Sequence, residues 1–429
     1  MHQAKHILDP VVAGKTQIGR GPLRIGFLTP EYPTEAYNGG IGSYVRQMAH
    51  SLVKLGHSAV VLLCVHSDEG IVWDGPVAVH RVSVPCFASR LPEPLGKRSG
   101  VIFARRLSML TDELKLDLLE APEFAGMTAF LNLVKPPRLH VVVRLHACSA
   151  ICRSLDNYGP TSIRSRLRSN LQDWLERRAI ETADSVTAIS QTTVDLTRKL
   201  LRVKRDDFQV TPNPVNDLFF SEWEAKPVSD EPQVLFVGRL QWLKGPDLLI
   251  QAVPALLKRH PDAHFCFAGG DTNTGPGGTS MLAHLLSMLP EQARARVEFT
   301  GFLQPEQVLR KYHEATVCVF PSRWEGFGLV AAEAMACGKA VILSDNPGFR
   351  ELLSDRGTGL LSKREDPQAL ASAVDLLLSD SHLRQTLGAA ARDDVLARFH
   401  GSAVGKSILS TYREAMVAGD TLLAKLTNT

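Results

Sequence analysis

The feature that most constrains the fold of this chain is the 25-residue stretch 320–344. Val317–Phe320 is an apolar run typical of a buried strand. Leu329–Ala336 is rich in helix formers, and Gly338 has the position of a glycine that ends a helix. A second apolar run follows at 340–343. The order strand, glycine loop, helix, strand predicts one βα unit of a parallel sheet.

The loop before this helix combines glycines with acids. Gly326 and Gly328 allow a ligand to approach the backbone closely. The helix start that follows presents free N–H groups and the positive end of the helix dipole to an anion. Glu325 precedes the helix and Glu333 lies inside it, and carboxylates accept hydrogen bonds from sugar hydroxyls. The loop therefore predicts a site for a phosphate with a hydroxyl-rich group beside it.

Length and composition indicate an ordinary globular protein of two domains. The chain has 429 residues, of which 44% are hydrophobic and 22% charged. It has no apolar run of the roughly 20 residues that cross a bilayer. Residues 1–21 lack the apolar core of a signal peptide, so we expect a flexible leader there. The seven cysteines form no C-x-x-C pair, which favours reduced thiols in a cytoplasmic protein.

Charge differs between the two halves of the chain. The net charge of +3 divides into +7 over residues 1–215 and −4 over the remainder. A basic N-terminal half is suited to anionic lipid, an anionic acceptor or nucleic acid, although an ordinary solvated surface explains it equally well. Because no nucleic-acid motif accompanies the charge, we expect no nucleic-acid partner, and peripheral contact with the inner face of a membrane stays open.

Strand and helix patterns alternate along both halves, which predicts two parallel sheets covered by helices. The strand-like runs lie at 24–29, 58–64, 77–82, 116–120, 140–145, 184–189, 234–237, 264–268, 297–300, 317–320 and 340–343. The polar stretch 147–162 is expected to be an irregular acceptor loop. The proline-rich stretch 211–216 is expected to link the two domains.

The string Glu325-Gly-Phe-Gly-Leu, with Glu333 eight positions after the first acid, is followed by Ala-Met-Ala-Cys-Gly-Lys-Ala-Val. It resembles the Glu-x7-Glu signature of retaining glycosyltransferases with the GT-B fold, in particular glycosyltransferase family 4. The resemblance covers roughly residues 22–418 and is densest over 233–345. It implies two Rossmann-like parallel-sheet domains that face each other across a cleft, with a C-terminal helix that crosses back to the N-terminal domain. The expected parts are a leader at 1–21, an acceptor-binding domain at 22–213, a nucleotide-sugar-binding domain at 214–398 and the crossing helix at 399–429.

The resemblance also implies a donor site. Arg239 and Lys244, in the basic loop after the 234–237 strand, would bind the donor diphosphate, where a guanidinium matches paired oxygens. Glu333 would bind the ribose hydroxyls and Glu325 the hydroxyls of the donor sugar. The other residues expected on the donor side are Gly39, Gly40, Ser190, Asn213, Thr300, Gly301, Phe302, Gly326, Phe327, Gly328 and Leu329.

His146 ends a strand in the string Val-Arg-Leu-His. By resemblance it would lie near the donor sugar and the developing oxocarbenium charge, and it completes a predicted catalytic set with Arg239, Lys244 and Glu325. Ser190 is also a good helix N-cap, which is an equally ordinary use of a serine there. Glu31 follows a predicted strand and Glu120 ends one, and both are candidates for the acceptor side.

The chemistry implied is hexosyl transfer from a nucleotide-diphosphate sugar, with retained anomeric configuration and front-face attack. The sequence has no Asp-x-Asp string and no histidine cluster with ligand spacing, so we expect no metal and no other cofactor. The acceptor would be a glycan, a lipid-linked molecule or a small molecule, as in polysaccharide biosynthesis. Two alternatives stay open: a catalytically silent subunit that binds sugar nucleotides, and another GT-B enzyme such as a nucleotide-sugar epimerase or a phosphorylase.

Overall fold

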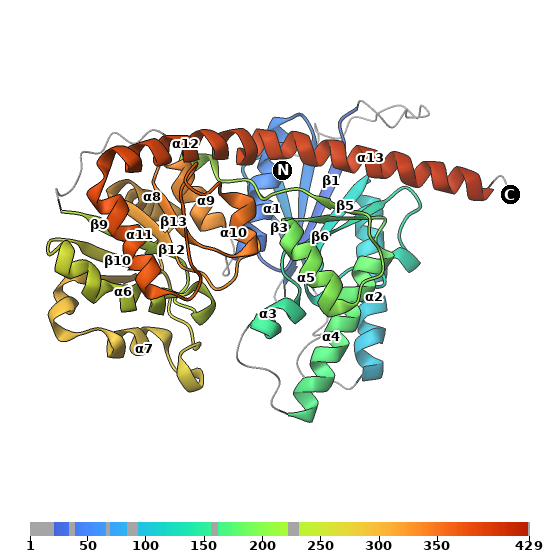
Figure 1. Cartoon of the computed structure of the whole chain (residues 1–429). Helices are drawn as coiled ribbons and strands as arrows, with labels where there is room; N and C mark the ends of the chain where they lie inside the picture. The colour runs from blue at the N-terminus through green and yellow to red at the C-terminus, as the bar shows by residue number, and fades with distance from the viewer. Residues whose placement is uncertain are drawn as a thin grey trace.

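The computed structural model describes residues 21–33, 39–65, 69–83, 93–155, 162–221 and 231–427. Apart from Gly21, the expected leader lies outside these residues. The described chain forms two α/β domains side by side, and helices α12 (Ser381–Phe399) and α13 (Gly401–Thr427) run along both of them (Figure 1).

The N-terminal sheet of the described residues has the strand order β3-β4-β2-β1-β5-β6-β7-β8. All neighbouring strands are parallel except β3 and β4. The strands are β1 (Arg24–Thr29), β2 (Ser58–Val65), β3 (Gly70–Asp74), β4 (Val77–Ser83), β5 (Leu118–Pro122), β6 (His140–Leu145), β7 (Ser185–Ala188) and β8 (Phe208–Val210). The helices are α1 (Gly40–Lys54), α2 (Glu93–Glu113), α3 (Ser149–Leu155), α4 (Ile163–Thr182) and α5 (Gln191–Leu201). The strand order reverses between β1 and β5, where parallel sheets leave a crevice for ligands.

The C-terminal sheet is parallel throughout the described residues, in the order β11-β10-β9-β12-β13-β14. Its strands are β9 (Gln233–Val237), β10 (His264–Ala268), β11 (Val297–Gly301), β12 (Val317–Phe320), β13 (Val341–Ser344) and β14 (Leu360–Ser362). Its helices are α6 (Pro246–Arg259), α7 (Met281–Met288), α8 (Pro305–Glu314), α9 (Leu329–Ala336), α10 (Pro347–Leu352) and α11 (Pro367–Ser379). The order reverses between β9 and β12, so the loops after these two strands meet at one edge of the sheet.

Two glycines are required by the backbone of these loops. Gly328, the N-cap of α9, has a φ of 89°, and a Cβ there would lie 2.5 Å from the ring of Phe349. Gly245 has a φ of 67°, and a Cβ there would lie 2.2 Å from the carbonyl oxygen of Pro321. Both the left-handed conformation and the close approach exclude larger residues. The two loops therefore lie directly against each other.

The predicted pair of parallel sheets is confirmed, and the exceptions are short elements. The antiparallel edge strand β3 and the three-residue strand β8 were not predicted. The stretch 147–162 was expected to be irregular, yet Ser149–Leu155 is the helix α3. The start of α3 is capped by Glu176, whose carboxylate accepts from the backbone N–H of Ser149 at 2.9 Å. Because this cap comes from α4, local sequence carries no signal for it.

The predicted crossing helix is also confirmed. Val404, Ile408, Leu409 and Tyr412 of α13 belong to the same buried cluster as Tyr44, Met48 and Leu52 of α1. A Cβ on Gly405 would lie 2.9 Å from a methyl carbon of Leu55, so a small residue lets the two helices approach closely.

A buried carboxylate lies at the centre of this contact. The Tyr44 hydroxyl donates to Glu120 Oε1 at 2.8 Å, and the Tyr412 hydroxyl donates to Glu120 Oε2 at 2.5 Å. Burial raises the pKa of Glu120, and the nearby Arg144 charge and the two hydroxyls oppose the rise. Glu120 thus joins strand β5 to a helix of the N-terminal domain and to the crossing helix.

The two domains also touch beside the cleft. Glu351 of α10 accepts from the backbone N–H groups of Gln191 and Thr192, each at 2.8 Å, at the N-terminus of α5. A Cβ on Gly326 would lie 3.0 Å from a methyl carbon of Ile189, so the glycine loop of the C-terminal domain packs on the N-terminal domain.

We expect Tyr412→Phe to lower the free energy of unfolding by about 1–3 kcal/mol, because it leaves one oxygen of buried Glu120 without its donor. Urea denaturation measures the change. Ser410→Ala, which removes an exposed hydroxyl from the same helix, is the matched control and should have little effect. Equal stability of the two variants would contradict a structural role for the Glu120 contact.

Candidate active site

A pocket of about 250 Å³ lies between the two domains. It brings together four of the predicted donor-side residues: Arg239, Phe302, Leu329 and Glu333. The opposite wall is α1 of the N-terminal domain, through Ser43, Arg46 and Gln47. The pocket therefore has one wall in each domain, as the predicted cleft requires.

The two loops that reach the pocket through Arg239 and Leu329 also carry the predicted cation and carboxylate, which form an ion pair. Lys244 Nζ lies 2.7 Å from Glu325 Oε1, and the Ser322 hydroxyl donates to the same oxygen at 2.9 Å. Glu325 is buried and Lys244 is partly exposed. The lysine follows β9 and the glutamate follows β12, so the strand-order reversal brings them together from 81 positions apart. A ligand that carries both an anionic group and hydroxyls has a partner for each member of this pair: the anion for Lys244 and the hydroxyls for Glu325.

A partly buried arginine holds the same two loops in place. Arg323 donates to both carboxylate oxygens of Asp247, at 2.9 and 2.7 Å, and to the Trp242 carbonyl at 2.6 Å. Its guanidinium carbon also lies 4.2 Å from the centre of the Trp242 ring. Because a bidentate pair fixes orientation as well as distance, Arg323 keeps the Lys244 loop in register with the Glu325 loop.

Glu333 lies in the pocket wall next to Tyr312. The Tyr312 hydroxyl lies 3.4 Å from Glu333 Oε2 and donates to the Val330 carbonyl at 2.8 Å. Burial raises the pKa of Glu333 to about 8, and the tyrosine hydroxyl opposes the rise. In the free protein, the ionised form of this carboxyl group is poorly solvated. Hydroxyl donors of a ligand would therefore stabilise it strongly.

Of the predicted donor-side residues, Thr300 and Gly301 end β11 and Phe302 follows it. Gly301 has a φ of 71°, and Phe302 has 64% of its surface exposed at the edge of the pocket. The Thr300 hydroxyl donates to the Gly301 carbonyl at 3.0 Å. An exposed aromatic ring beside a pocket is a surface on which a planar ring can stack.

His146 directly follows β6 and lies next to the glycine loop. Its carbonyl oxygen would lie 3.3 Å from a Cβ on Gly326, so the histidine backbone contacts the C-terminal domain. Its ring packs on Tyr44 with centroids 5.2 Å apart. Burial lowers the pKa of His146, and the Arg144 charge lowers it further, so the imidazole is neutral at neutral pH. The Glu123 carboxyl group accepts a hydrogen bond from the backbone N–H of His146 at 3.0 Å, and burial raises the pKa of Glu123 to about 8.

Asn213 is positioned by an arginine that sequence reasoning gave no role. Arg144 is fully buried and donates to Asn213 Oδ1 at 3.1 Å, to the Thr211 carbonyl at 2.7 Å and to the Thr211 hydroxyl at 2.6 Å. Its guanidinium carbon lies 4.1 Å from the centre of the Tyr44 ring. Arg144 therefore fixes the linker between the domains to β6, two residues before His146.

The N-terminus of α1, predicted to approach the donor phosphate, already has a carboxylate partner. Glu31 Oε1 accepts from the backbone N–H of Gly42 at 2.9 Å. A Cβ on Gly39, the N-cap, would lie 2.5 Å from both carboxylate oxygens. Gly40, the first residue of the helix, has open space around it. Glu31 thus lies at the start of α1, where it caps the helix.

Three of the predicted side chains have partners within the protein. The Ser190 hydroxyl caps α5 by accepting from the Thr193 N–H at 3.1 Å. Phe327 packs edge-on against Phe399 of α12, with centroids 5.2 Å apart, inside a core cluster. Glu120 binds two tyrosine hydroxyls in the core, so the structure does not place it on the acceptor side. Contacts with distant residues orient Phe327 and Glu120, whereas the Ser190 cap is local.

Sequence reasoning also missed residues that position the site. Ser322 lies three residues before Glu325, and that spacing could have suggested the contact. Arg323 and Asp247 are 76 positions apart, so nothing local indicates their pairing. Within the described residues, no group of three or more His, Cys, Asp or Glu side chains is arranged to hold a metal ion. Of the helices that the structure describes, none combines the length and apolar character needed to cross a membrane.

Family models match both domains. The model "Glycosyl transferase 4-like domain" matches residues 39–214, and "Glycosyl transferases group 1" matches residues 220–394. Fold, site and these matches define the class of protein as a glycosyltransferase with the GT-B fold. Together the two models cover most of the chain, and it belongs to the family 4-like glycosyltransferases.

Individual proteins agree with this assignment. A D-inositol 3-phosphate glycosyltransferase of Corynebacterium aurimucosum is 27% identical over 409 residues, which are 90% of this chain and 93% of the relative. The sucrose-phosphate synthase of Thermosynechococcus elongatus has a TM-score of 0.72 at 24% identity, covering 92% of this chain and 100% of that structure. The Anabaena protein Alr3699/HepE in complex with UDP-glucose has a TM-score of 0.66 at 18% identity, covering 91% and 100%. The two structures show a shared fold.

The pKa of Glu333 gives a prediction about the free protein. Between an ordinary glutamate pKa near 4.5 and about 8, the unfolded chain is ionised at this residue and the folded protein is not. The free energy of unfolding therefore falls as the pH rises through this window. Glu333→Gln cannot ionise, so the variant lacks this pH-dependent loss of stability. We expect the melting temperature of the variant to rise by roughly 2–4 °C relative to wild type between about pH 5 and pH 8. A difference that does not change with pH would contradict the raised pKa.

Proposed function

We propose that this protein transfers a hexosyl group from a nucleotide-diphosphate sugar to a hydroxyl acceptor, with retention of anomeric configuration and without a metal ion. The observation that carries the proposal is the Lys244–Glu325 ion pair, on two loops that also reach a pocket with one wall in each domain. It supplies a cation for a diphosphate and a carboxylate for sugar hydroxyls within one contact. The intact set of Arg239, Lys244, Glu325 and Glu333 argues against a catalytically silent subunit.

In this proposal the C-terminal domain stabilises the leaving group. Arg239, Lys244 and the N-terminus of α9 at Gly328 and Leu329 bind the diphosphate, whose charge grows as the glycosidic bond breaks. Glu333 accepts hydrogen bonds from the ribose hydroxyls, and Phe302 lies against the base. Fixed cations take the place of a metal here, so neither Mg²⁺ nor Mn²⁺ is required.

Transfer follows a front-face course. The C1–O bond to the diphosphate breaks, and the acceptor oxygen forms its bond to C1 from the same side of the sugar ring. The acceptor proton passes to the departing phosphate oxygen, so no protein base is needed. Glu325 binds the hydroxyls of the donor sugar. His146, kept neutral by burial, lies close to the sugar without placing a positive charge beside the oxocarbenium-like transition state.

The donor we propose to test first is a UDP-hexose, because a structural neighbour with the same fold was solved with UDP-glucose. The acceptor hydroxyl belongs to a glycan, a lipid-linked saccharide or a small molecule, and the N-terminal domain holds it opposite the donor. We also propose that the basic N-terminal domain makes peripheral contact with an anionic membrane.

A panel of UDP-, GDP- and ADP-hexoses tests the proposal through release of free nucleotide, with and without EDTA. We expect one donor to be turned over at the same rate in EDTA, and the anomeric signal of the product in NMR to match that of the donor. Loss of activity in EDTA that Mg²⁺ restores would overturn the metal-independent mechanism. Tight donor binding without turnover would favour the silent subunit, and an inverted product would exclude front-face retention.

The donor contacts predict two different kinetic defects. Lys244→Ala should lower kcat by about 10²–10³-fold with a smaller change in KM, because the lysine acts on charge that develops in the transition state. Glu333→Ala should mainly weaken donor binding, as measured by titration calorimetry. Lys363→Ala, an exposed lysine of the same domain, is the matched control. Wild-type kinetics for both active-site variants would remove these residues from the donor site.

A further inference from the structure

The outer half of α4 has a surface that the proposed chemistry does not use. The first turns of α4 extend beyond α2 and α3 at the far end of the N-terminal domain (Figure 1). Ile163 and Leu167 have 79% and 66% of their surface exposed, and Trp174 has 39%. Isolated exposed apolar residues are ordinary, but three on one helix indicate a surface with a function.

These residues form one stripe. Ile163, Leu167, Leu171 and Trp174 are spaced i, i+4, i+8 and i+11, so they fall within about 80° of the helix circumference at about 100° per residue. The opposite side of the helix is the buried one, through Glu176, Ala179 and Ile180. Ile163 and Leu167 at the outer end therefore face away from the domain, which is the reverse of the usual arrangement for a helix that covers a sheet. Leu171 is half-buried, and Trp174 also packs against Phe130, with ring centroids 6.1 Å apart.

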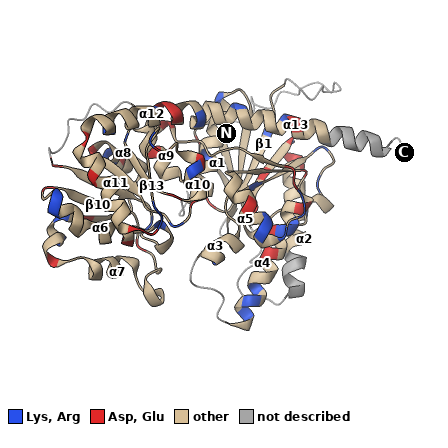
Figure 2. Cartoon of the chain, viewed as in Figure 1, with Lys and Arg blue, Asp and Glu red and all other residues tan. Residues whose placement is uncertain are grey.

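Arginines flank the stripe on both sides. Arg164 and Arg168 lie along one edge and Arg166 and Arg177 along the other, and basic positions mark the outer end of α4 in Figure 2. Arg164, Arg166 and Arg168 are exposed, and no ion pair of these three is found within the described residues. The sequence 162–172 contains no Asp or Glu. Three cations without acidic neighbours next to exposed aliphatic side chains match an anionic surface with an apolar interior.

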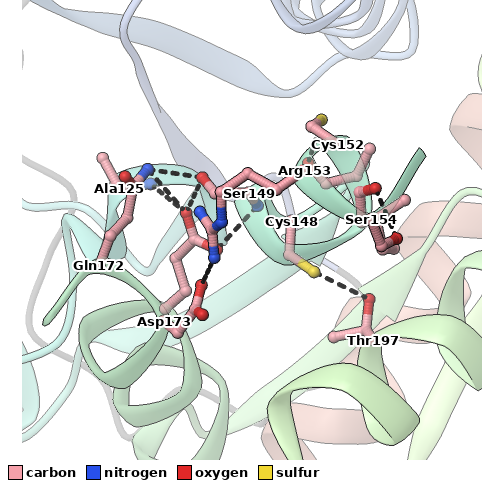
Figure 3. Close-up of polar contacts among 12 residues, drawn as sticks. Ala125, Cys148, Ser149, Cys152, Arg153, Ser154, Gln172, Asp173 and Thr197 are labelled. Carbon is pink, nitrogen blue, oxygen red and sulfur yellow. Dashed lines mark hydrogen bonds and ion pairs between the residues drawn. The ribbon is translucent and has the colours of Figure 1, made fainter. Parts of the chain in front are cut away.

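Hydrogen bonds fix the orientation of this helix relative to the cleft (Figure 3). Glu176 of α4 accepts from the Ser149 N–H at 2.9 Å and from the Ser149 hydroxyl at 2.5 Å, and Gln172 donates to that hydroxyl at 2.5 Å. Arg153 of α3 pairs with Asp173 of α4. α3 begins three residues after His146, which follows β6. The contacts between α3 and α4 therefore join α4 to the end of β6, next to the glycine loop around Gly326.

We propose that the stripe Ile163, Leu167, Leu171 and Trp174, with its flanking arginines, docks this protein on an anionic lipid bilayer. The helix lies along the headgroup region with its apolar stripe toward the acyl chains, and Arg164, Arg166 and Arg168 bind lipid phosphates, while Arg177 is paired with Glu181. The amphipathic ring of Trp174 is suited to the same depth. This docking surface gives a location to the membrane contact of the proposed function. That the docked protein then acts on a membrane-borne acceptor rests on the proposed function.

Vesicle sedimentation of the full chain tests the surface. We expect binding to phosphatidylcholine vesicles that contain about 30% phosphatidylglycerol, weak binding to phosphatidylcholine alone, and a fall in binding between about 0.1 and 0.5 M NaCl. Replacing Arg164, Arg166 and Arg168 with Gln should reduce binding roughly 100-fold, at about five-fold per cation. The control with Arg294, Arg310 and Arg364 replaced by Gln removes the same charge from exposed positions in the other domain and should bind like wild type.

A second variant separates a bilayer from other anionic partners. Ile163→Ser with Leu167→Ser keeps every charge, and we expect it to lower vesicle binding at least ten-fold. Full binding by this variant, or equal loss in the two arginine triples, would overturn the proposal. Binding to soluble heparin that needs the arginines but not the aliphatic pair, with no vesicle binding, would assign the surface to a soluble polyanion instead.

Nucleotide release without vesicles keeps this result separate from the proposed function. Both α4 variants should turn over the donor at the wild-type rate, because no residue they change lines the pocket. Vesicle binding through α4 in a protein that turns over no donor would support the surface and reject the glycosyltransferase proposal. Donor turnover without vesicle binding would do the opposite.

Discussion

The contact that the rest of this structure depends on is the carboxylate of Glu120, buried between the hydroxyls of Tyr44 and Tyr412. A buried carboxylate that lacks its hydrogen-bond donors destabilises the folded state. The three groups therefore favour one arrangement of β5, α1 and α13. Because α13 continues from α12 of the C-terminal domain, this arrangement also constrains how the two domains face each other. The pocket between them exists only while that relation holds.

The two sides of the cleft are held in different ways. On the donor side, the Arg323–Asp247 ion pair holds the loops after β9 and β12 together. These loops approach each other closely at Gly245 and Pro321. On the other side, Arg144 ties the linker to β6, and the carboxylates of Glu123 and Glu176 bind backbone N–H groups after the strand. On both sides, ionisable side chains hydrogen-bond to backbone groups, and these contacts hold the segments that carry His146 and Glu325.

On the donor side, the chemistry that the sequence predicts is local. The glycine loop, the two acids and the helix start lie within one unit and predict a phosphate and hydroxyl site, and the family resemblance adds Arg239 and Lys244 from one loop. The sequence did not indicate the partners of Phe327 and Glu120, because whether an aromatic ring or a carboxylate packs in a core depends on distant residues such as Phe399 and Tyr412. The short helix α3 was missed for the same reason, since its cap is supplied by α4.

By itself, the sequence determined the alternation of strands and helices, the βα unit around the glycine loop and the identity of the charged groups, because these follow from periodicity and residue chemistry along the chain. Only the tertiary structure decided which of those groups meet. The Lys244–Glu325 pair, the Arg323–Asp247 pair and the outward direction of the α4 stripe depend on strand order and on which helix face finds a core. Those are properties of packing between distant segments, and no local pattern encodes them.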